Sequence, residues 1–478
     1  MSNLINTLMS TASALDAYSQ VLSVTQNNVA NASTPGYAKQ SEQLIALRFD
    51  PTLGFTGGVQ AGQVSSSRNE FAEQSVRQQT SVLGQAQQTV NSLGSLQSLF
   101  DVTGTSGIAT ALNNLYQSFS AWGQTPNGAV ARQSVIQRAT DVASAFQQTA
   151  TGLAKVSQDN NLQMQQTVSE INHLSEVLAG YNTQILKGDR NDAGLDAQIH
   201  STLEQLSQDA DITATKQTDG SYTVLLNGES PLVIADRTYA LRAMPVAPAS
   251  TDPYPQGPAG IRLVAGDGRD VTLNTTGGQL GSLLNLANVV LPGYLGDGTH
   301  AGDLNTLALN FASHVNDLLK QGSQTDGANP VPGVPLFSYD LTNDTNVAQS
   351  LKVDPAVTPD QLAAIQLGPP EVSNGVALAL SQLANPTDAT GKIGGLSYTE
   401  YYASLASGIG TKLTDAKDQL GAQQSAVVQA QNLRQQLSGV SLDEEATILI
   451  QFQRAYEANS KMITILNQLT QDIIDILH

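Results

Sequence analysis

Histidine is the residue type in this chain best suited to bind a metal ion or to transfer protons near neutral pH. The five histidines are His173, His200, His300, His314 and His478. Their spacing predicts that none shares a helix face with a second histidine or a carboxylate in the arrangement of a zinc site. The chain also has no cysteine to supply a thiolate ligand or nucleophile. We therefore expect no metal site, and we expect the histidines at exposed helix positions and loop ends.

Three other features could carry chemistry, and each has a simpler structural interpretation. The glycine-rich segments 266–268, 277–278 and 293–298 lack the glycine and lysine spacing of phosphate-binding loops, which favours turns. The acidic run 443–445 lies where a helix should begin, and carboxylates there stabilise the positive end of the helix dipole. Trp122 follows other aromatic residues and is typical of a core anchor. We expect no catalytic or cofactor-binding residue and no enzymatic activity.

Composition favours long helices and excludes one class of partner. Only 13% of the 478 residues are charged and 5% are aromatic, whereas 40% are hydrophobic. Such a mixture suits long helices with shallow apolar seams. The net charge of −19 repels phosphate backbones, so we expect no nucleic-acid partner. No run approaches the roughly 18 apolar residues of a spanning helix, and the first residues lack the pattern of a secretory signal, so no membrane partner is expected.

The N-terminal segment carries a heptad pattern. Leu8, Leu15, Leu22 and Val29 stand seven residues apart, which predicts one apolar face of a helix, widened by neighbouring small residues. The helix should stop near residues 31–33, because a Pro-Gly pair follows in the positions of a type II turn. The assembly residues predicted here are Leu4, Leu8, Leu15, Tyr18, Leu22, Val29, Asn31, Pro35, Gly36 and Tyr37.

The C-terminal segment carries a second apolar seam. Ser441 and Glu444 have the spacing of a capping box, so a helix should begin there. From residue 449 the seam alternates steps of three and four residues to the last residue but one, and it includes Thr470. Polar seam residues such as Asn459 and Thr470 could fix the register of a coiled coil. The predicted residues are Ser441, Glu444, Leu449, Phe452, Tyr456, Asn459, Ile463, Leu466, Ile473 and Leu477.

Between these ends, helical periodicity dominates. Further seams run over 164–185, 195–206 and 402–437, with shorter helical windows at 93–100, 112–119 and 304–319. Short β-branched runs separated by Asp-Gly and Asn-Gly turns occupy the segment 212–276. We predict a mainly α fold: a terminal α-helical coiled coil plus an elongated helical bundle with a small inserted β domain. The predicted domains are a terminal coiled coil (1–70 and 438–478), a helical bundle (71–211, 277–325 and 374–437), the β insert (212–276) and a loop-rich insert packed on the bundle (326–373).

The two ends of the chain also resemble a known family. The segment 27–37, Asn-Asn-Val-Ala-Asn-Ala-Ser-Thr-Pro-Gly-Tyr, resembles the N-terminal signature of flagellar rod, hook and hook-associated axial proteins. The segments 438–445 and 451–461 resemble the C-terminal signature of the same proteins. The long helical middle, with Leu203-Glu204-Gln205-Leu206 followed by Thr218-Asp219-Gly220, is similar to the hook-associated members.

The resemblance implies a secreted structural subunit at the junction of hook and filament, exported by the flagellar type III apparatus. It implies four partners: copies of the chain itself in a helical layer, the hook subunit, hook-associated protein 3, and an export chaperone before secretion. The alternatives are another axial protein such as a hook or distal rod subunit, a flagellum-carried hydrolase, and a secreted coiled-coil adhesin.

Overall fold

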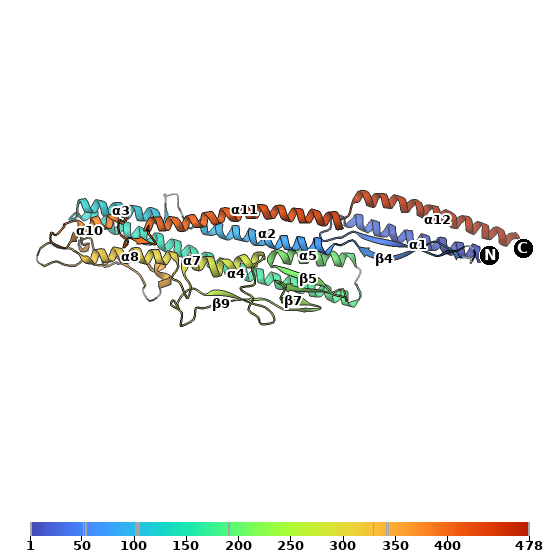
Figure 1. Ribbon diagram of the computed structural model, residues 1–478, viewed down its shortest axis with the longest axis horizontal. Coiled ribbons are helices and arrows are strands. Elements are labelled where there is room, and N and C mark those ends of the chain that lie inside the picture. Colours follow the sequence, from blue (N-terminus) through green and yellow to red (C-terminus); the bar gives the residue numbers. More distant parts are fainter. Residues whose placement is uncertain are drawn as a thin grey trace. The chain divides into compact units, whose positions relative to one another are not determined.

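The computed structural model describes residues 2–476 except 51, 53–54, 101–105, 190–191, 328, 341 and 343. Figure 1 shows that long helices make up most of the chain, with short strands between them. The chain forms two compact units: residues 1–82, 172–239 and 423–478 belong to the first, and residues 83–171 and 240–422 belong to the second. The helical periodicity therefore predicted the fold class correctly.

Twelve α-helices form over the described residues. They are α1 (Ser2–Asn31), α2 (Glu70–Gln97), α3 (Gly107–Gln124), α4 (Ala129–Lys187), α5 (Ala193–Asp209), α6 (Gly278–Asn285), α7 (Leu291–Leu295), α8 (Asp303–Gln321), α9 (Val347–Ser350), α10 (Gly375–Gln382), α11 (Tyr398–Ser438) and α12 (Leu442–Ile476). A π-helix, Leu286–Val290, continues α6 into α7.

The strands are short and antiparallel. They are β1 (Gln40–Ala46), β2 (Phe49–Asp50), β3 (Phe55–Thr56), β4 (Val59–Ser66), β5 (Ile212–Lys216), β6 (Tyr222–Leu226), β7 (Ser230–Ile234), β8 (Arg237–Thr238), β9 (Arg242–Val246), β10 (Gly260–Val264), β11 (Gly322–Ser323), β12 (Phe337–Ser338), β13 (Lys352–Val353), β14 (Ile365–Gln366), β15 (Lys392–Ile393) and β16 (Leu396–Ser397). The sheet β5-β6-β7-β8 has four strands, and the others described have two.

The first unit contains the terminal helix pair. Helices α1 and α12 lie side by side in opposite directions, so that the start of α1 lies near the end of α12 (Figure 1). The β1–β4 hairpin covers part of α1, where the Ser10 and Ser13 hydroxyls donate to the carbonyl oxygens of Gly57 at 2.9 Å and Val59 at 3.1 Å. These bonds satisfy hairpin carbonyls without a further strand. The terminal coiled coil is therefore a helix pair with a hairpin attached.

The segment predicted as one β insert forms two separate sheets. The β5–β8 sheet belongs to the first unit, where Asn182 of α4 binds the backbone of Tyr222 and Ala235 at 2.7–2.8 Å. The β9–β10 hairpin belongs to the second unit, where Asn288 of the π-helix binds the N–H and carbonyl of Ile261 at 2.7 and 2.8 Å. The structure thus divides residues 212–276 differently from the sequence prediction, because asparagines on two different helices anchor the two sheets.

The second unit is a helical bundle around an aromatic core. Trp122, Phe146 and Phe311 are fully buried, and they come from α3, α4 and α8. Phe311 also contacts Tyr398 of α11 with 5.5 Å between ring centroids. Full burial of each aromatic side chain stabilises the fold by about 1.5–3 kcal/mol. Trp122 is a core anchor, as the sequence predicted.

Buried asparagines on α8 hold the loop-rich segment 326–373 against this bundle. Asn316 donates to the carbonyl of Phe337 at 2.8 Å and accepts from the N–H groups of Leu336 and Phe337 at 2.9 and 2.8 Å. Asn305 binds the carbonyl of Thr345 and the N–H of Ala348 in the same way. Beside the short β12–β13 pairing in this segment, side-chain amides thus satisfy buried backbone groups of the loop.

Candidate assembly site at the chain termini

The two signature segments, which lie at opposite ends of the sequence, bind each other directly. The side-chain amide of Asn28 in α1 donates to Glu445 Oε2 in α12 at 3.0 Å and to the carbonyl of Gln40 at 2.8 Å. Its oxygen accepts from the N–H of Gln40 and from the hydroxyl of Tyr37, each at 2.9 Å. Asn28 therefore uses both ends of its amide to join the α1 helix, the chain after its turn, and α12.

Lys39 supplies the positive charge that this cluster needs. Its Nζ lies 2.9 Å from Glu444 Oε2 and 3.2 Å from Glu445 Oε1. The hydrogen bond to Glu444 raises the pKa of Lys39, and Glu445 adds to this effect against the opposing effect of desolvation. Only 1% of the Glu445 side chain is exposed, so its charge is balanced within the protein. We call Asn28, Tyr37, Lys39, Gln40 and Glu445 the signature cluster.

The corner between α11 and α12 is fixed to the same strand-and-turn region. The carbonyl of Ser438 accepts from the N–H of Lys39 at 2.9 Å, and its hydroxyl accepts from the N–H of Asn69 at 2.9 Å. The N–H of Gly439 returns to the carbonyl of Gln435, which ends α11. Ser438 of the C-terminal signature thus satisfies the backbone N–H groups of Lys39 and Asn69, which follow the N-terminal signature in the chain.

The capping box predicted for α12 is built differently from its sequence pattern. The Ser441 hydroxyl accepts from the N–H of Glu444 at 3.4 Å, as expected for a helix start. The Glu444 carboxylate, however, takes Lys39 as its partner. An ion pair to a distant residue has replaced the local bond, because the folded chain brings a lysine within reach.

The type II turn after α1 forms as predicted and lies against α5. Gly36 has φ +75°, and the N–H of Tyr37 returns to the carbonyl of Thr34 at 3.2 Å. The guanidinium of the buried Arg68 donates to the carbonyl of Gly36 at 2.7 Å and to Glu73 and Asp196, each at 2.6 Å. One arginine therefore connects the signature turn with α2 and α5.

His200 lies in this ionic network, contrary to the expectation that the histidines would be exposed. It follows Asp196 by one helical turn of α5, a His–carboxylate spacing that the sequence reading missed, with 3.9 Å between Nε2 and Oδ1. Its Nε2 lies 3.0 Å from the hydroxyl of Tyr222, and only 2% of the residue is exposed. Burial, and then the nearby Arg68, holds the pKa of His200 well below its usual value. The imidazole is therefore neutral and part of the core.

The predicted N-terminal stripe lies on the flank of the buried face of α1. The stripe residues Leu4, Leu8, Leu15, Tyr18 and Leu22 are half-buried, and Val29 is 42% exposed. The fully buried positions are smaller or more polar: Thr11, Ala14, Ala17, Val21, Thr25 and Asn28. Asn31 donates to the carbonyl of Asn27, while Pro35 is exposed and Gly36 and Tyr37 are half-buried in the turn.

The predicted C-terminal stripe faces α1 over most of its described length. Phe452 packs on Tyr18 with 5.6 Å between ring centroids, Leu466 is buried, and Leu449, Asn459 and Ile463 are half-buried. Ser441, Glu444, Tyr456 and Ile473 are exposed. Leu477 lies outside the described residues. The sequence missed Asn28, Lys39 and Glu445 as contact residues; for Asn28 and Glu445, their places inside the two signatures were the available signal.

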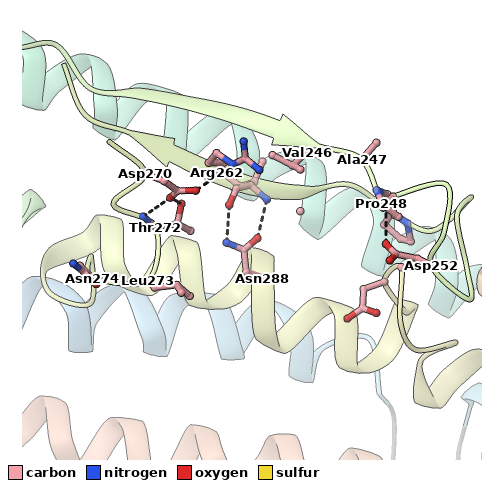
Figure 2. Close-up of a pocket in the computed structure, with 16 residues that line it drawn as sticks. Val246, Ala247, Pro248, Asp252, Arg262, Asp270, Thr272, Leu273, Asn274 and Asn288 are labelled. Atoms are coloured by element: carbon pink, nitrogen blue, oxygen red, sulfur yellow. Dashed lines mark hydrogen bonds and ion pairs between the residues drawn. The ribbon is translucent and has the colours of Figure 1, made fainter. Parts of the chain in front are cut away.

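The second unit contains a pocket of about 720 Å³ beside the β9–β10 hairpin (Figure 2). Its charged groups are held by local bonds. Arg262 lies 3.2 Å from Asp270, which also accepts from the N–H of Thr272, and Asp252 accepts from the N–H of Ala249. Among the described residues, no group of three or more His, Asp or Glu side chains could hold a metal ion. None of the described helices is long and apolar enough to cross a membrane.

Comparison with known proteins agrees with this geometry. The model for the flagellar hook-associated protein FlgK helical domain matches residues 93–337, just over half of the chain. The chain belongs to the flagellar hook-associated protein FlgK family. The model for the C-terminal region of flagellar basal body rod FlgEFG proteins matches residues 434–476, which include the C-terminal signature. The resemblance seen in the signatures is thereby confirmed.

Individual relatives of the FlgK family match along their whole length. Flagellar hook-associated protein 1 of Bacillus subtilis is 27% identical over 97% of this chain and 96% of its own, and that of Escherichia coli is 24% identical over 100% of both. The structure titled as the flagellar hook junction protein FlgK from Burkholderia pseudomallei has a TM-score of 0.61 at 17% identity, covering 76% of this chain and 99% of that one. This member of the FlgK family is thus a structural protein of the bacterial flagellum with the mainly α fold of its relatives.

Proposed function

We propose that this protein forms the layer between the flagellar hook and the filament, and that the α1–α12 pair is its assembly surface. The observation that carries the proposal is the bond between Asn28 and Glu445, which joins the two signature segments into one surface. The helical-domain match favours this role over that of a hook or rod subunit. The partners we propose are copies of the chain, the hook subunit, hook-associated protein 3 and, before export, a chaperone.

Apolar exposure on α12 supports an assembly role. Ile465 is 55% exposed. The other exposed large apolar residues of this helix are Leu442, Ile450, Tyr456, Met462, Leu469, Ile473 and Ile474. A monomer gains nothing from a helix that leaves so many apolar side chains in water, whereas neighbouring subunits would bury them. The unoccupied side of α12 therefore suits packing against further helices. We propose a purely structural role without an active site, outside the cell and independent of membrane or nucleic acid.

Deletion of the gene tests the proposed position. Cells without the protein should build hooks but release filament subunits into the medium, where immunoblotting detects them. Attached filaments of normal length in the deletion strain would contradict the proposal. Loss of the hooks themselves would instead favour a rod or hook subunit.

A point variant tests the assembly surface. Ile465→Glu places a charge on the exposed apolar side of α12, so it should be exported but fail to restore filaments in the deletion strain. Asn467→Glu is the control, because this exposed polar position lies on the same helix and receives the same charge. Equal restoration by both variants would contradict the role of the apolar side chains.

A further inference from the structure

Little on the buried α1 face of the seam between α1 and α12 fixes its register, although the half-buried Tyr18 packs on Phe452. The fully buried α1 positions of the seam are mostly Ala, Val and Thr, such as Ala14, Ala17 and Val21. Small side chains offer shallow knobs, which can slide by one turn into the next hole at low cost. The polar seam residues expected to set the register bind their own helix: Asn459 donates to the carbonyl of Ala455 and Thr470 to that of Leu466.

The signature cluster contains groups that can fix the register of the two helices. Glu445 is the buried charge of α12, and its carboxylate reaches Asn28 at 3.0 Å and Lys39 at 3.2 Å. Asn28 is equally buried, and its oxygen is already occupied by Gln40 and Tyr37. A slip of α12 by one helical turn moves Glu445 about 5.4 Å away from Asn28 and Lys39, which leaves its carboxylate in the interior without these partners, whereas Asn28 keeps its bonds to Gln40 and Tyr37. Only one register satisfies all of them.

We infer that Asn28 and Glu445, supported by Lys39, are positioning residues that set the register of the terminal helix pair, while the apolar seam supplies association without register. This inference deepens the proposed assembly function, because a fixed register determines which apolar side chains of α12 face a neighbouring subunit. A single buried polar pair fixes alignment in this way when every other alignment leaves it unpaired. Each of the two signatures then supplies one residue of the pair that fixes the register of α1 and α12.

Paired spin labels on the full chain measure the register directly. The protein has no cysteine, so labels attach only at introduced positions. Met9→Cys on α1 and Gln453→Cys on α12 are both exposed and lie at different levels of the pair, since Tyr18 contacts Phe452. Sliding one helix along the other therefore changes the distance between the labels, which double electron–electron resonance reads as a distribution.

Variants in the signature cluster and in the apolar seam should have different effects on the distance between the labels. The parent should give one narrow distance, whereas Glu445→Ala and Asn28→Ala should each give a second population displaced by up to about one helical turn, 5.4 Å. Glu445→Gln should keep the parent distance, because its amide oxygen can still accept from Asn28. Val21→Ala, which trims the seam, should also keep the parent distance while it lowers the thermal midpoint of the helix pair.

Three outcomes would overturn the inference. They are a broad distribution in the parent, an unchanged single distance in both alanine variants, and the same displacement in Val21→Ala. Circular dichroism should show native helix content in each variant, so that the distances report alignment rather than unfolding; unfolding confined to Glu445→Ala leaves Asn28→Ala to decide. The measurement needs no flagellum, so its failure is distinguishable from a failure of the proposed position in the hook–filament layer.

Discussion

Gly36 lies directly against the carbonyl oxygen of Ala197, so closely that a Cβ atom at position 36 has no room. The glycine is in the left-handed region with φ +75°, and the same peptide presents its carbonyl to Arg68. Two requirements, a positive φ and a close approach between backbones, therefore meet at one residue. This contact places the signature turn on α5, at the base of the terminal helix pair.

Gly36→Ala should destabilise the first unit by about 2–4 kcal/mol, since it combines backbone strain of about 1–2 kcal/mol with a clash against Ala197. Hydrogen exchange of the α5 amides measures the loss. Gly228→Ala is the matched control, because Gly228 has nearly the same φ of +73° but its Cβ would meet only the Thr213 hydroxyl at 3.5 Å. The control should lose only the stability that corresponds to the backbone strain. Equal losses of stability in the two variants would show that the approach of Gly36 to α5 is not tight.

Stability of the first unit should fall as the pH drops below about 6.5, the ordinary pKa of histidine. The folded state holds the pKa of His200 well below that value through burial, and then through Arg68, Arg77, Lys216 and Arg434. Below pH 6.5 the unfolded chain therefore binds a proton that the folded chain does not bind. Each pH unit in that window costs up to about 1.4 kcal/mol, until the folded pKa is reached.

Replacement of His200 should remove this contribution. We expect His200→Gln to be less stable than the parent at pH 7.5, because it loses the contact with Tyr222, but to lose less additional stability between pH 7.5 and 5.0. Urea unfolding at the two pH values measures both effects. His173→Gln, at an exposed position of α4, should keep the parent's pH dependence. If His200→Gln loses as much stability between pH 7.5 and 5.0 as the parent does, another group is responsible for the pH dependence.

Asn316→Ala should loosen the segment 326–373 without unfolding the bundle. The variant leaves the N–H groups of Leu336 and Phe337 and the carbonyl of Phe337 without their partner, at a cost of about 1–3 kcal/mol for each group that water cannot reach. Amide exchange at residues 336–337 should accelerate strongly. Asn310→Ala on the same helix is the control, because its amide binds only Thr306 of its own helix at an exposed position. Unchanged exchange at 336–337 would show that other contacts hold the loop.

The sequence predicted helices most reliably where periodicity and end signals coincided. The stop of α1 at Asn31 and the start of α12 at Leu442 follow from a Pro-Gly turn and a Ser cap. Helices α2 and α4 are much longer than their predicted seams, because Gln, Ser, Thr and Ala interrupt the apolar pattern without ending the helix. Residues with sufficient helix propensity continue a helix through a polar stretch, where apolar periodicity alone would predict a loop.

The sequence by itself determined the class of the protein, the two terminal helices and the motifs that place it among flagellar axial proteins, because these depend on residues close together in the chain. Only the tertiary structure decided that Asn28 meets Glu445, that Glu444 pairs with Lys39 and that His200 is buried. The Asn28–Glu445 and Lys39–Glu444 contacts join segments that are distant in sequence, and the first forms because buried polar groups need partners, whereas Glu444 is exposed. Local pattern carries no record of which partner that is.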